Sequence, residues 1–381
     1  MPPDPDSGAA GTEWQTIHAL RARGHEVDEI WAGDLGRRIR HGNLHYLLEL
    51  PYRYRDVIGE RCASKRFDVI HVNQGHCYLA AARHRHERRP GVFVCRSHGL
   101  DDHMERVLKP WRSRLGVRGR SGPKALAGEA IDRLLHRHDR LAYRDADGVL
   151  VSSSIDEAYL RDQMHVTAER IGRIAQAPAA AFVATPASPM GGERLKRLLH
   201  VGGFAYWKGV HAVAESLNRL ATRHVDWRMT WVCRSEEQAH VLQLLSPDVR
   251  DRLELVAWVT QQQLCRIYDQ HGIFLSPSLF EGFGKVFIEA MARGMCVIGT
   301  HAGGMPDVIE DGRSGYLVGF NDADAIVQRI EALWRNPAAA AALSAHAAAR
   351  ANAYSWDRVA RDTEAFYERL SAHKYPEGQV A

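Results

Sequence analysis

The chain has 381 residues, more than a single hydrophobic core usually serves, so we expect two domains. Apolar residues make up 45% and charged residues 25% of the chain, as in an ordinary globular protein. The net charge of only +4 argues against a nucleic-acid-binding protein. No apolar run reaches the roughly 18 residues that a membrane-spanning helix needs.

The amino terminus and the cysteines both favour a cytoplasmic protein. The segment Met1–Asp6 lacks the basic and apolar regions of a signal peptide. The six cysteines are scattered and contain no Cys-x-x-Cys pair, so we expect reduced thiols and no zinc site.

Strand-like and helix-like segments alternate through the first half, as in α/β domains with parallel sheets. A helix over Glu13–Arg23 ends at Gly24. Short apolar runs predict strands, and a long helical stretch from about Leu126 to Asp145 precedes the last of them. The predicted strands are Val27–Trp31, Phe67–Val72, Val92–Arg96 and Gly148–Val151.

The start of the chain departs from this pattern, because a parallel α/β domain normally opens with a buried strand. Here a Pro/Asp/Gly-rich loop leads into a helix at about Thr12. Either the first strand is absent or the true start lies upstream of Met1, and we favour the second interpretation. A missing first strand would leave neighbouring strands with an exposed edge.

Residues 177–194 are rich in Ala, Pro and Gly and predict an interdomain linker. The α/β alternation then restarts, and the chain ends in an Ala-rich helix and an amphipathic helix over Ser355–His373. The intervening strands and helices are predicted over Leu198–Val201, Val210–Arg223, Met229–Cys233, Leu253–Ala257, Gln262–Gln270, Ile273–Leu275, Lys285–Arg293 and Cys296–Thr300.

The stretch from Ser276 to Ala292 carries the clearest chemical signal. It follows a predicted strand and enters a helix through a glycine-containing loop, which presents free backbone N–H groups and the positive end of a helix dipole to a diphosphate. Glu281 lies in the loop and Glu289 on the helix, roughly 8 Å beyond Gly284 at about 1.5 Å per residue. Two carboxylates so placed can accept hydrogen bonds from sugar hydroxyls on both sides of a diphosphate. For Glu281 alone, a surface carboxylate beside a turn would be the simpler interpretation.

This stretch resembles the Glu-x7-Glu signature of the retaining glycosyltransferases of family four, which have the GT-B fold. The residues that carry the resemblance around it follow the order and spacing of that family. They are Trp258-Val259, Pro277-Ser278, Gly294, Gly303-Gly304, Pro306, Asp311-Gly312 and Gly315-Tyr316-Leu317-Val318.

The resemblance implies an α/β protein of GT-B architecture with two Rossmann-like domains that face each other across a cleft. Residues 1–176 would form an acceptor-side domain and residues 195–352 a donor-binding domain. A last helix within 353–381 would cross back to the first domain. In the family, the first Glu contacts the donor sugar and the second holds the ribose, roles that pass here to Glu281 and Glu289. The amides of Phe283, Gly284, Lys285 and Val286 would hold the diphosphate, with Val259 also at the donor.

The segment from Val201 to Gly209 resembles the family's strand and loop ending in Lys-Gly, where the lysine reaches the diphosphate. Lys208 therefore takes that catalytic role, and a solvated loop lysine is the alternative. Gly203 departs from the family, which often has an arginine here as a second phosphate contact. Arg234, which follows the next strand, is the candidate to compensate.

In the first domain, Ser97-His98-Gly99 follows a predicted strand and resembles the family's His-Gly near the reacting sugar. An ordinary turn histidine is the alternative, since the chain has 21 histidines. The run Ser7–Glu13 resembles the glycine loop that faces the diphosphate, which makes Gly11 and Thr12 candidate donor contacts.

The expected reaction moves a hexose-like group from a nucleoside diphosphate to an acceptor hydroxyl of a glycan, glycolipid or small molecule, with anomeric configuration retained. The resemblance implies front-face displacement, with Glu281 not acting as a nucleophile, and no metal or other cofactor. Two Asp-x-Asp triplets, at 145–147 and 322–324, lie at element boundaries rather than beside the donor loop, so neither is expected to bind metal.

Residues 106–124 hold seven basic side chains and no acidic one, interleaved with Trp and Leu. This composition suits peripheral contact with an anionic membrane that carries a lipid-linked acceptor, at the inner face. A solvated basic loop is the alternative.

Three rival functions remain. A non-catalytic GT-B-like protein that binds a sugar nucleotide or a partner is favoured by the missing strand and Gly203, and opposed by Lys208, Glu281 and Glu289. A nucleotide-sugar epimerase shares the architecture, but the Glu-x7-Glu stretch favours a transferase. A dinucleotide dehydrogenase would need a Gly-x-Gly-x-x-Gly after a first strand, and the sequence shows none.

Overall fold

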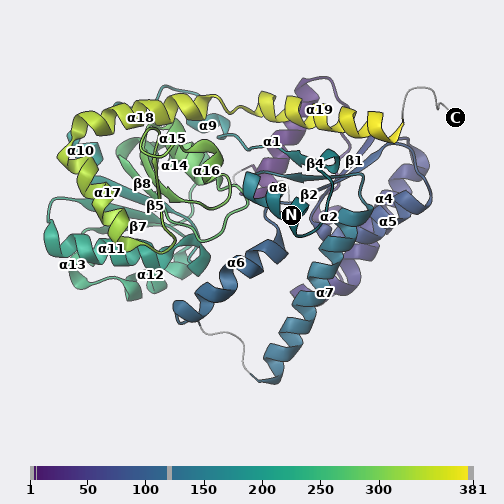
Figure 1. The fold of residues 1–381 in the computed structure, drawn as a ribbon, viewed down its shortest axis with the longest axis horizontal. Helices are drawn as coiled ribbons and strands as arrows, with labels where there is room; N and C mark the ends of the chain where they lie inside the picture. Colours follow the sequence, from purple (N-terminus) through teal and green to yellow (C-terminus); the bar gives the residue numbers. More distant parts are fainter. Residues whose placement is uncertain (1–3, 6, 118–121, 376–381) are drawn as a thin grey trace. The chain divides into compact units, whose positions relative to one another are not determined.

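The structure is a computed structural model that describes residues 4–5, 7–117 and 122–375. The chain forms two compact units, each with its own parallel sheet. The first unit comprises residues 1–106, 118–175 and 356–381, and the second comprises residues 107–117 and 176–355. Figure 1 shows both units in the colours of the sequence.

The first unit has a four-stranded sheet in the order β1-β2-β3-β4, and all neighbouring strands are parallel. The strands are β1 (Val69–Asn73), β2 (Val92–Arg96), β3 (Gly148–Val151) and β4 (Ile171–Arg173). The longer helices are α1 (Ala9–Ala22), α4 (Leu50–Ser64), α5 (Tyr78–His86), α6 (Asp101–Arg114, which continues into the second unit), α7 (Pro123–Asp145), α8 (Ser154–Asp162) and α19 (Trp356–Lys374). Shorter helices are α2 (Ala32–Leu35), α3 (Gly42–Leu44), the π-helix η1 (His45–Glu49), η2 (Gly75–Cys77) and η3 (Ala168–Arg170).

The strand expected over Val27–Trp31 does not form, so that prediction is wrong. Residues 25–31 have no regular secondary structure and pair with no strand of the described sheets. A strand exists only where a neighbour satisfies its N–H and C=O groups, and an apolar run alone cannot supply that neighbour. β1 lies at the edge of the described sheet, and four of its five residues keep partial exposure.

Helix α19 completes the core of the first unit. Its side chains Val359, Phe366 and Leu370 are buried. Gly148 and Gly172 lie directly beneath it, and a Cβ atom at Gly148 would lie 2.4 Å from the Leu370 side chain. The helix also packs along α1. Residues 356–374 therefore belong structurally with the beginning of the chain.

The second unit has a six-stranded parallel sheet in the order β10-β9-β8-β5-β6-β7. Its buried β5, β6, β8 and β9 read as near-continuous apolar runs, as expected for strands covered on both faces. The strands are β5 (Arg197–Val201), β6 (Arg228–Val232), β7 (Leu253–Val256), β8 (Ile273–Ser276), β9 (Cys296–Thr300) and β10 (Tyr316–Val318).

Helices cover the sheet of the second unit, and α11 and α17 present strongly amphipathic faces whose apolar side chains join the core. The main helices are α11 (Val210–Arg223), α12 (Gln238–Leu244), α14 (Gln261–Gln270), α15 (Lys285–Ala292), α17 (Ala323–Arg335) and α18 (Pro337–Asn352). Short helices are α9 (Ala180–Val183), α10 (Gly192–Leu195), η4 (Tyr206–Lys208), η5 (Ser235–Glu237), α13 (Pro247–Arg250) and α16 (Met305–Val308).

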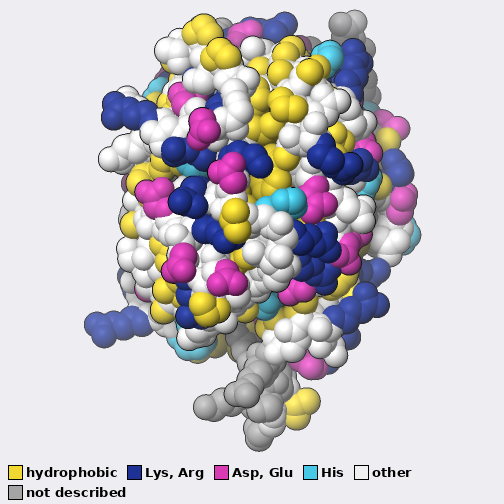
Figure 2. All heavy atoms as spheres, turned by 90° about the vertical axis from the view of Figure 1, so that its left-hand side faces the viewer, with side chains coloured by type: hydrophobic (Ala, Val, Ile, Leu, Met, Phe, Trp, Pro, Cys, Tyr) yellow, Lys and Arg dark blue, Asp and Glu magenta, His cyan; other side chains and the backbone are white. Residues whose placement is uncertain are grey.

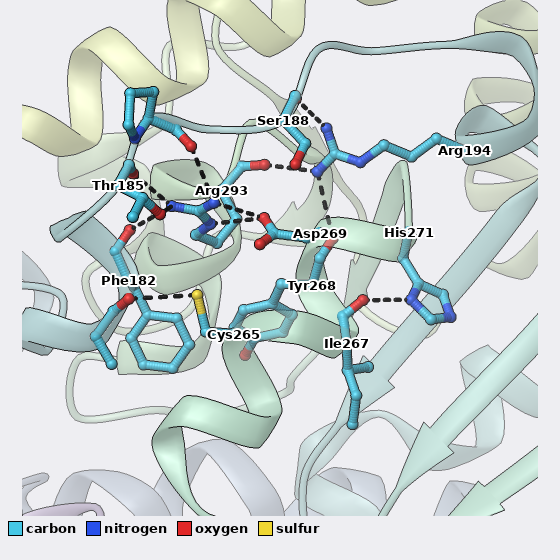
Figure 3. A network of polar contacts seen from close by, with 12 residues as sticks. Phe182, Thr185, Ser188, Arg194, Cys265, Ile267, Tyr268, Asp269, His271 and Arg293 are labelled. Carbon is cyan, nitrogen blue, oxygen red and sulfur yellow. Dashed lines mark hydrogen bonds and ion pairs between the residues drawn. The ribbon is translucent and has the colours of Figure 1, made fainter.

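Two buried arginines fix the segment 182–188 to the second unit (Figure 3). Arg293, at the end of α15, donates to the carbonyls of Thr185 (2.7 Å) and Pro186 (3.0 Å) and pairs with Asp269. Arg194 donates to the carbonyls of Ser188, Tyr268 and Arg293. Charge-assisted bonds of this kind are stronger than neutral ones, so the segment predicted as a linker is held firmly on one unit.

Basic and acidic side chains are interspersed over the face of the second unit that Figure 2 shows. Ion pairs within the second unit include Arg223 with Glu331 and Arg219 with Glu215. That face therefore carries no extended field of one sign. Among the described residues, no helix is both long enough and apolar enough to cross a bilayer.

Candidate functional site

The strand order of the second unit predicts where a ligand binds. β5 and β8 are neighbours, but the chain leaves β5 toward β6 on one side of the sheet and leaves β8 toward β9 on the other. In open α/β sheets, ligands bind at the carboxyl ends of the strands at such a switch point. The loops there are residues 202–209 after β5 and residues 277–284 after β8.

Backbone contacts hold these two loops together. The N–H of Leu279 donates to the carbonyl of Trp207 at 2.7 Å. Gly209 has a φ of +74°, and a Cβ atom there would lie 2.0 Å from the carbonyl oxygen of Pro277. Only glycine tolerates both this backbone conformation and this approach. The glycine after Lys208 therefore sets the distance between the loops.

Two of the predicted catalytic side chains meet at this switch point. The ammonium group of Lys208 donates to both carboxylate oxygens of Glu281, at 2.8 and 2.9 Å. The hydroxyl of Ser278 donates to Glu281 Oε1 at 2.8 Å. Glu281 is 9% exposed and Lys208 30% exposed at the side chain, so the pair lies at the surface of the loops with the cation outermost. The arrangement presents a positioned positive charge to solvent.

A third loop packs beneath Glu281 and Phe283. A Cβ atom at Gly303 would lie 2.6 Å from Cβ of Glu281, and one at Gly304 would lie 2.2 Å from the Phe283 ring. Phe283 is buried and packs on Phe287 with ring centroids 5.5 Å apart. The side chain of Phe283 is thus part of the core, and only its backbone is placed to meet a donor.

The predicted diphosphate seat is the first turn of α15. Gly284 caps the helix in the left-handed region, with a φ of +93°. The eight-residue helix that follows begins at Lys285, and both Lys285 and Val286 are half-buried. The first N–H groups of a helix have no intrahelical acceptor, and the dipole adds positive potential there. This turn therefore suits an anionic group, as the sequence predicts.

Glu289 lies one turn further along α15 and is 5% exposed. Burial raises the pKa of its carboxyl group to about 7, against a small opposing effect of Lys285. A buried carboxyl of this kind is costly when ionised and becomes favourable when hydroxyl groups donate to it. The geometry is therefore compatible with the predicted role in holding a ribose.

The other predicted donor contacts in the second unit lie outside the two loops that follow β5 and β8. Val259 is half-buried in the loop between β7 and α14. Arg234 is exposed at the start of η5. At Gly203, a Cβ atom would lie 3.5 Å from a carboxylate oxygen of Glu237, which accepts from the N–H of Phe204 at 3.0 Å. The Glu237 carboxylate thus lies beside Gly203, the position where the resemblance would place an arginine.

The predicted residues of the first unit form a separate group. Gly11 and Thr12 lie inside the first turn of α1, which begins at Ala9 rather than at about Thr12. Thr12 is fully buried, and its hydroxyl donates to the carbonyl of Gly8 at 3.0 Å. His98 follows β2, and its Nε2 lies 3.0 Å from Oε1 of Glu13. The roles of these three residues stay predictions.

Sequence reasoning missed two residues that the structure joins to the predicted ones. Ser278 stands in the quoted Pro277-Ser278 pair but was assigned no role, although its hydroxyl binds Glu281. Glu13 stands at the end of the quoted glycine loop, and it is 6% exposed. A lone acid directly after Gly-Thr at the start of a helix was the available signal.

A cavity of about 560 Å³ lies elsewhere in the second unit, between α11 and the start of α17. Its charged lining residues are largely paired, as Arg219 is with Glu215 and Asp324. None of the predicted site residues lines it. The strand order and the Lys208–Glu281 pair therefore locate the candidate site better than cavity size does.

Comparison with known sequences gives the family. Residues 195–336 match the family model described as "Glycosyl transferases group 1". These residues contain β5, β8 and α15, and with them Lys208, Glu281 and Glu289. The second unit carries a group 1 glycosyltransferase domain.

Curated proteins that are similar to this chain match it over only part of their own length. "Spore coat protein SA" of Bacillus subtilis is 28% identical over 192 residues, which is 48% of this chain and 51% of that protein. "D-inositol 3-phosphate glycosyltransferase" of Mycobacterium avium is 36% identical over 137 residues, 33% of this chain and 32% of that protein. The chain thus spans about half or less of the length of these relatives.

Solved structures similar to the whole chain give the fold. Sucrose-phosphate synthase from Thermosynechococcus elongatus matches with a TM-score of 0.72 and 21% identity, covering 96% of this chain and 94% of that one. HepE of Anabaena in complex with UDP-glucose matches with a TM-score of 0.61 and 18% identity, covering 84% and 82%. The prediction of an α/β protein with the GT-B fold is confirmed.

Proposed function

We propose that the protein is a retaining glycosyltransferase that moves a sugar from a nucleoside diphosphate to an acceptor hydroxyl. The observation that carries this proposal is the meeting of Lys208 and Glu281 at the switch point of the second sheet. The first turn of α15 and the buried Glu289 follow directly along the same chain segment.

Each group has a distinct task in the proposed reaction. The Lys208 ammonium and the N–H groups at the start of α15 stabilise the negative charge that develops on the departing diphosphate. Glu289 accepts hydrogen bonds from the ribose. Glu281 fixes Lys208 and, once the donor is bound, accepts from a hydroxyl of the transferred sugar. Since Glu281 is engaged by Lys208 and Ser278, it serves as an acceptor rather than as a nucleophile.

The donor nucleotide is the next point to determine, and UDP is the first candidate. Support for it comes from HepE, which shares the fold and whose structure holds UDP-glucose. The acceptor is a hydroxyl compound of glycan, glycolipid or small-molecule type.

A peripheral membrane contact through residues 106–124 is part of the proposal. Arg112 donates to the Tyr206 hydroxyl at 2.8 Å, and Trp111 packs edge-on against Phe320, so these two side chains are engaged within the second unit. Lys109 and Arg114 are exposed. Arg118 and Arg120 lie outside the described residues. The basic contact with anionic lipid therefore rests on Lys109 and Arg114.

The proposal is tested by thermal unfolding of the purified protein against UDP, GDP, dTDP, ADP and their glucose conjugates. A ligand at about 100 times its dissociation constant stabilises the folded state by roughly 2.7 kcal/mol. We expect one base to raise the unfolding midpoint of the wild type, and Glu289→Ala and Lys208→Ala to lose most of that shift.

A matched control separates the site from general charge effects. Lys196→Ala removes a lysine of the second unit that packs over the Trp334 ring, away from the switch point, and should keep the full shift. Nucleotide binding without release of the nucleotide from its sugar conjugate, with or without acceptors, would favour the non-catalytic alternative. Epimerised free sugar among the products would favour the epimerase. No stabilisation of the folded wild type by any base would refute the proposed donor site.

A further inference from the structure

A carboxylate is buried beside an arginine and two histidines in the first unit, near the start of α1. Glu13 is 6% exposed. Its Oε1 lies 3.0 Å from His98 Nε2 and 3.4 Å from Arg96 Nη1, and its Oε2 lies 3.9 Å from His71 Nε2. We call these four residues the Glu13 cluster. It joins α1 to the middle of β1 and to the end of β2.

The other residues of the Glu13 cluster stabilise the negative charge of Glu13. Burial by itself would raise the pKa of this carboxyl, but the positive charge of Arg96 and the contacts from His98 and His71 outweigh burial and hold the pKa well below its usual value. Burial also lowers the pKa of His71 to about 4, so His71 is neutral at physiological pH. Arg96, 2% exposed, is then the fixed cation that balances Glu13.

The imidazole of His98 faces this carboxylate, with Nε2 3.0 Å from Oε1, a close contact that lacks the geometry of a hydrogen bond. An ionised carboxylate is an acceptor only, so the nitrogen that faces it, Nε2, must carry a proton. The other nitrogen, Nδ1, is buried and has no hydrogen-bond partner among the described residues. An unpartnered buried polar atom costs about 1–3 kcal/mol, a cost that a substrate hydroxyl would remove.

The location of His98 is where a ligand is expected. The turn 97–99 begins directly after β2, at the carboxyl end of a central strand of a parallel sheet. Gly99 has a φ of +143°, and its N–H donates to the Ser97 hydroxyl. This bond closes the turn that carries His98, and the Glu13 carboxylate lies against the His98 ring.

We propose that Glu13 is a positioning residue, which holds the His98 imidazole with Nε2–H toward its carboxylate and so presents His98 to a substrate hydroxyl during sugar transfer. This inference rests on the proposed function. Glu13 does not touch substrate. It acts through the orientation and the proton position of His98, and its charge is stabilised by Arg96.

The test is a double-mutant cycle between Glu13→Gln and His98→Ala, read out as release of UDP from UDP-glucose, or from the glucose conjugate of whichever base stabilises the protein. The amide of Gln keeps the shape of Glu but not its charge. We expect Glu13→Gln to lower kcat at least about tenfold while KM for the donor changes less than about twofold, because Lys208, Glu289 and the first turn of α15, which are proposed to hold the nucleotide, lie in the second unit. In the His98→Ala background, Glu13→Gln should lower kcat less than about twofold further.

Two further variants control for folding. Glu364→Gln removes a carboxylate that also lies in the contact of α1 with α19 and pairs with Arg23 and His25, and it should leave kcat unchanged. If Glu13→Gln does not fold, Glu13→Asp keeps the charge beside Arg96 and withdraws the oxygen from His98, and kcat should still fall.

The outcomes are distinguishable. A kcat of Glu13→Gln, or of Glu13→Asp where only that variant folds, equal to that of the wild type would overturn the positioning role and leave the proposed function standing. Losses of kcat that multiply in the double variant would overturn it as well, since a purely structural Glu13 would act independently of His98. A wild type that neither binds nor cleaves any nucleotide sugar would overturn both proposals.

Discussion

Burial favours the neutral form of the Glu289 carboxyl group, whereas its role in the proposed reaction favours the ionised form. Burial raises its pKa from 4.5 to about 7, so ionising it in the folded chain is unfavourable. A ribose that donates hydroxyl hydrogens to it needs the ionised form as the better acceptor. The same residue therefore weakens the fold and serves the ligand, a conflict that is common at functional sites.

This conflict predicts a pH dependence. Because the folded-state pKa is raised, the folded chain binds a proton that the unfolded chain has released, and the stability contribution of Glu289 is lost as pH rises from about 4.5 through 7. At 1.36 kcal/mol per pKa unit the loss is at most about 3 kcal/mol. Glu289→Gln should therefore unfold at a higher temperature than the wild type at pH 8, with a smaller difference at pH 5.

Nucleotide affinity should change with pH in the opposite direction to stability. Nucleotide affinity of the wild type should increase between pH 6 and 8, as Glu289 ionises, whereas the weaker affinity of Glu289→Gln should stay nearly constant. Calorimetric titration and thermal unfolding in the same buffers measure both quantities. Parallel pH curves for the two proteins would show that Glu289 does not titrate in this range.

At the scale of elements, the donor site depends on how closely the loop after β5 approaches the loop after β8. Lys208 and Glu281 are 73 residues apart in sequence and come from different loops. Backbone bonds from Leu279 and Phe280 to Trp207 hold those loops together. The ion pair is thus a consequence of backbone packing and not of two flexible side chains finding each other.

Gly209→Ala should disrupt this packing. Both Gly209 and Gly312 have a φ of +74°, but a Cβ atom at Gly209 would clash with Pro277, whereas a Cβ atom at Gly312 meets nothing within 4 Å. Gly312→Ala should therefore cost only about 1–2 kcal/mol for the left-handed conformation. Gly209→Ala adds the displacement of a loop and should cost more, with a several-fold loss of nucleotide affinity that Gly312→Ala does not show.

Denaturant unfolding and nucleotide titration of both variants measure this difference. Equal losses of stability, together with unchanged nucleotide affinity in Gly209→Ala, would mean that the approach of the two loops is not needed for the donor site.

The sequence predicted β5, β6, β8 and β9 well because each is largely buried and reads as an apolar run bounded by polar turns. It failed at residues 27–31, since an apolar run becomes a strand only beside a partner, and pairing is not encoded locally. Lys208 and Glu281 were each predicted separately from their motifs. Their contact, like that of Glu13 with His98, joins segments more than 70 residues apart and follows only from the folded chain.

At the scale of the whole molecule, the donor and the acceptor of the proposed reaction would require different parts of the protein. The nucleotide donor needs the second unit, while the acceptor of a lipid-linked reaction would require the protein to reach a membrane surface. Lys109 and Arg114 are exposed basic residues of segment 106–124 that can face such a surface, with the Arg114 guanidinium over the Trp111 ring.

Neutralising these two residues should weaken binding to vesicles that contain anionic lipid. A basic residue near such a surface contributes about 1 kcal/mol, so Lys109→Gln with Arg114→Gln should lower the vesicle affinity by roughly 30-fold. Cosedimentation with phosphatidylserine-containing and with neutral vesicles measures this effect. The control is the pair Arg266→Gln and Arg335→Gln, which removes the same charge from exposed sites of the second unit. Equal binding by both double variants would refute the basic contact.

The two arginines that hold residues 182–188 have a consequence for building chimeras. Six backbone carbonyls of the linker and of the α14–α15 region accept from Arg194 and Arg293. A module excised at residue 195 would lose Arg194 and would leave Arg293 with Asp269 but without its three acceptors at Phe182, Thr185 and Pro186. Crossover points at 175/176 and 355/356 would instead transplant the linker together with the unit that holds it, and keep α19 with the first unit, whose core it completes.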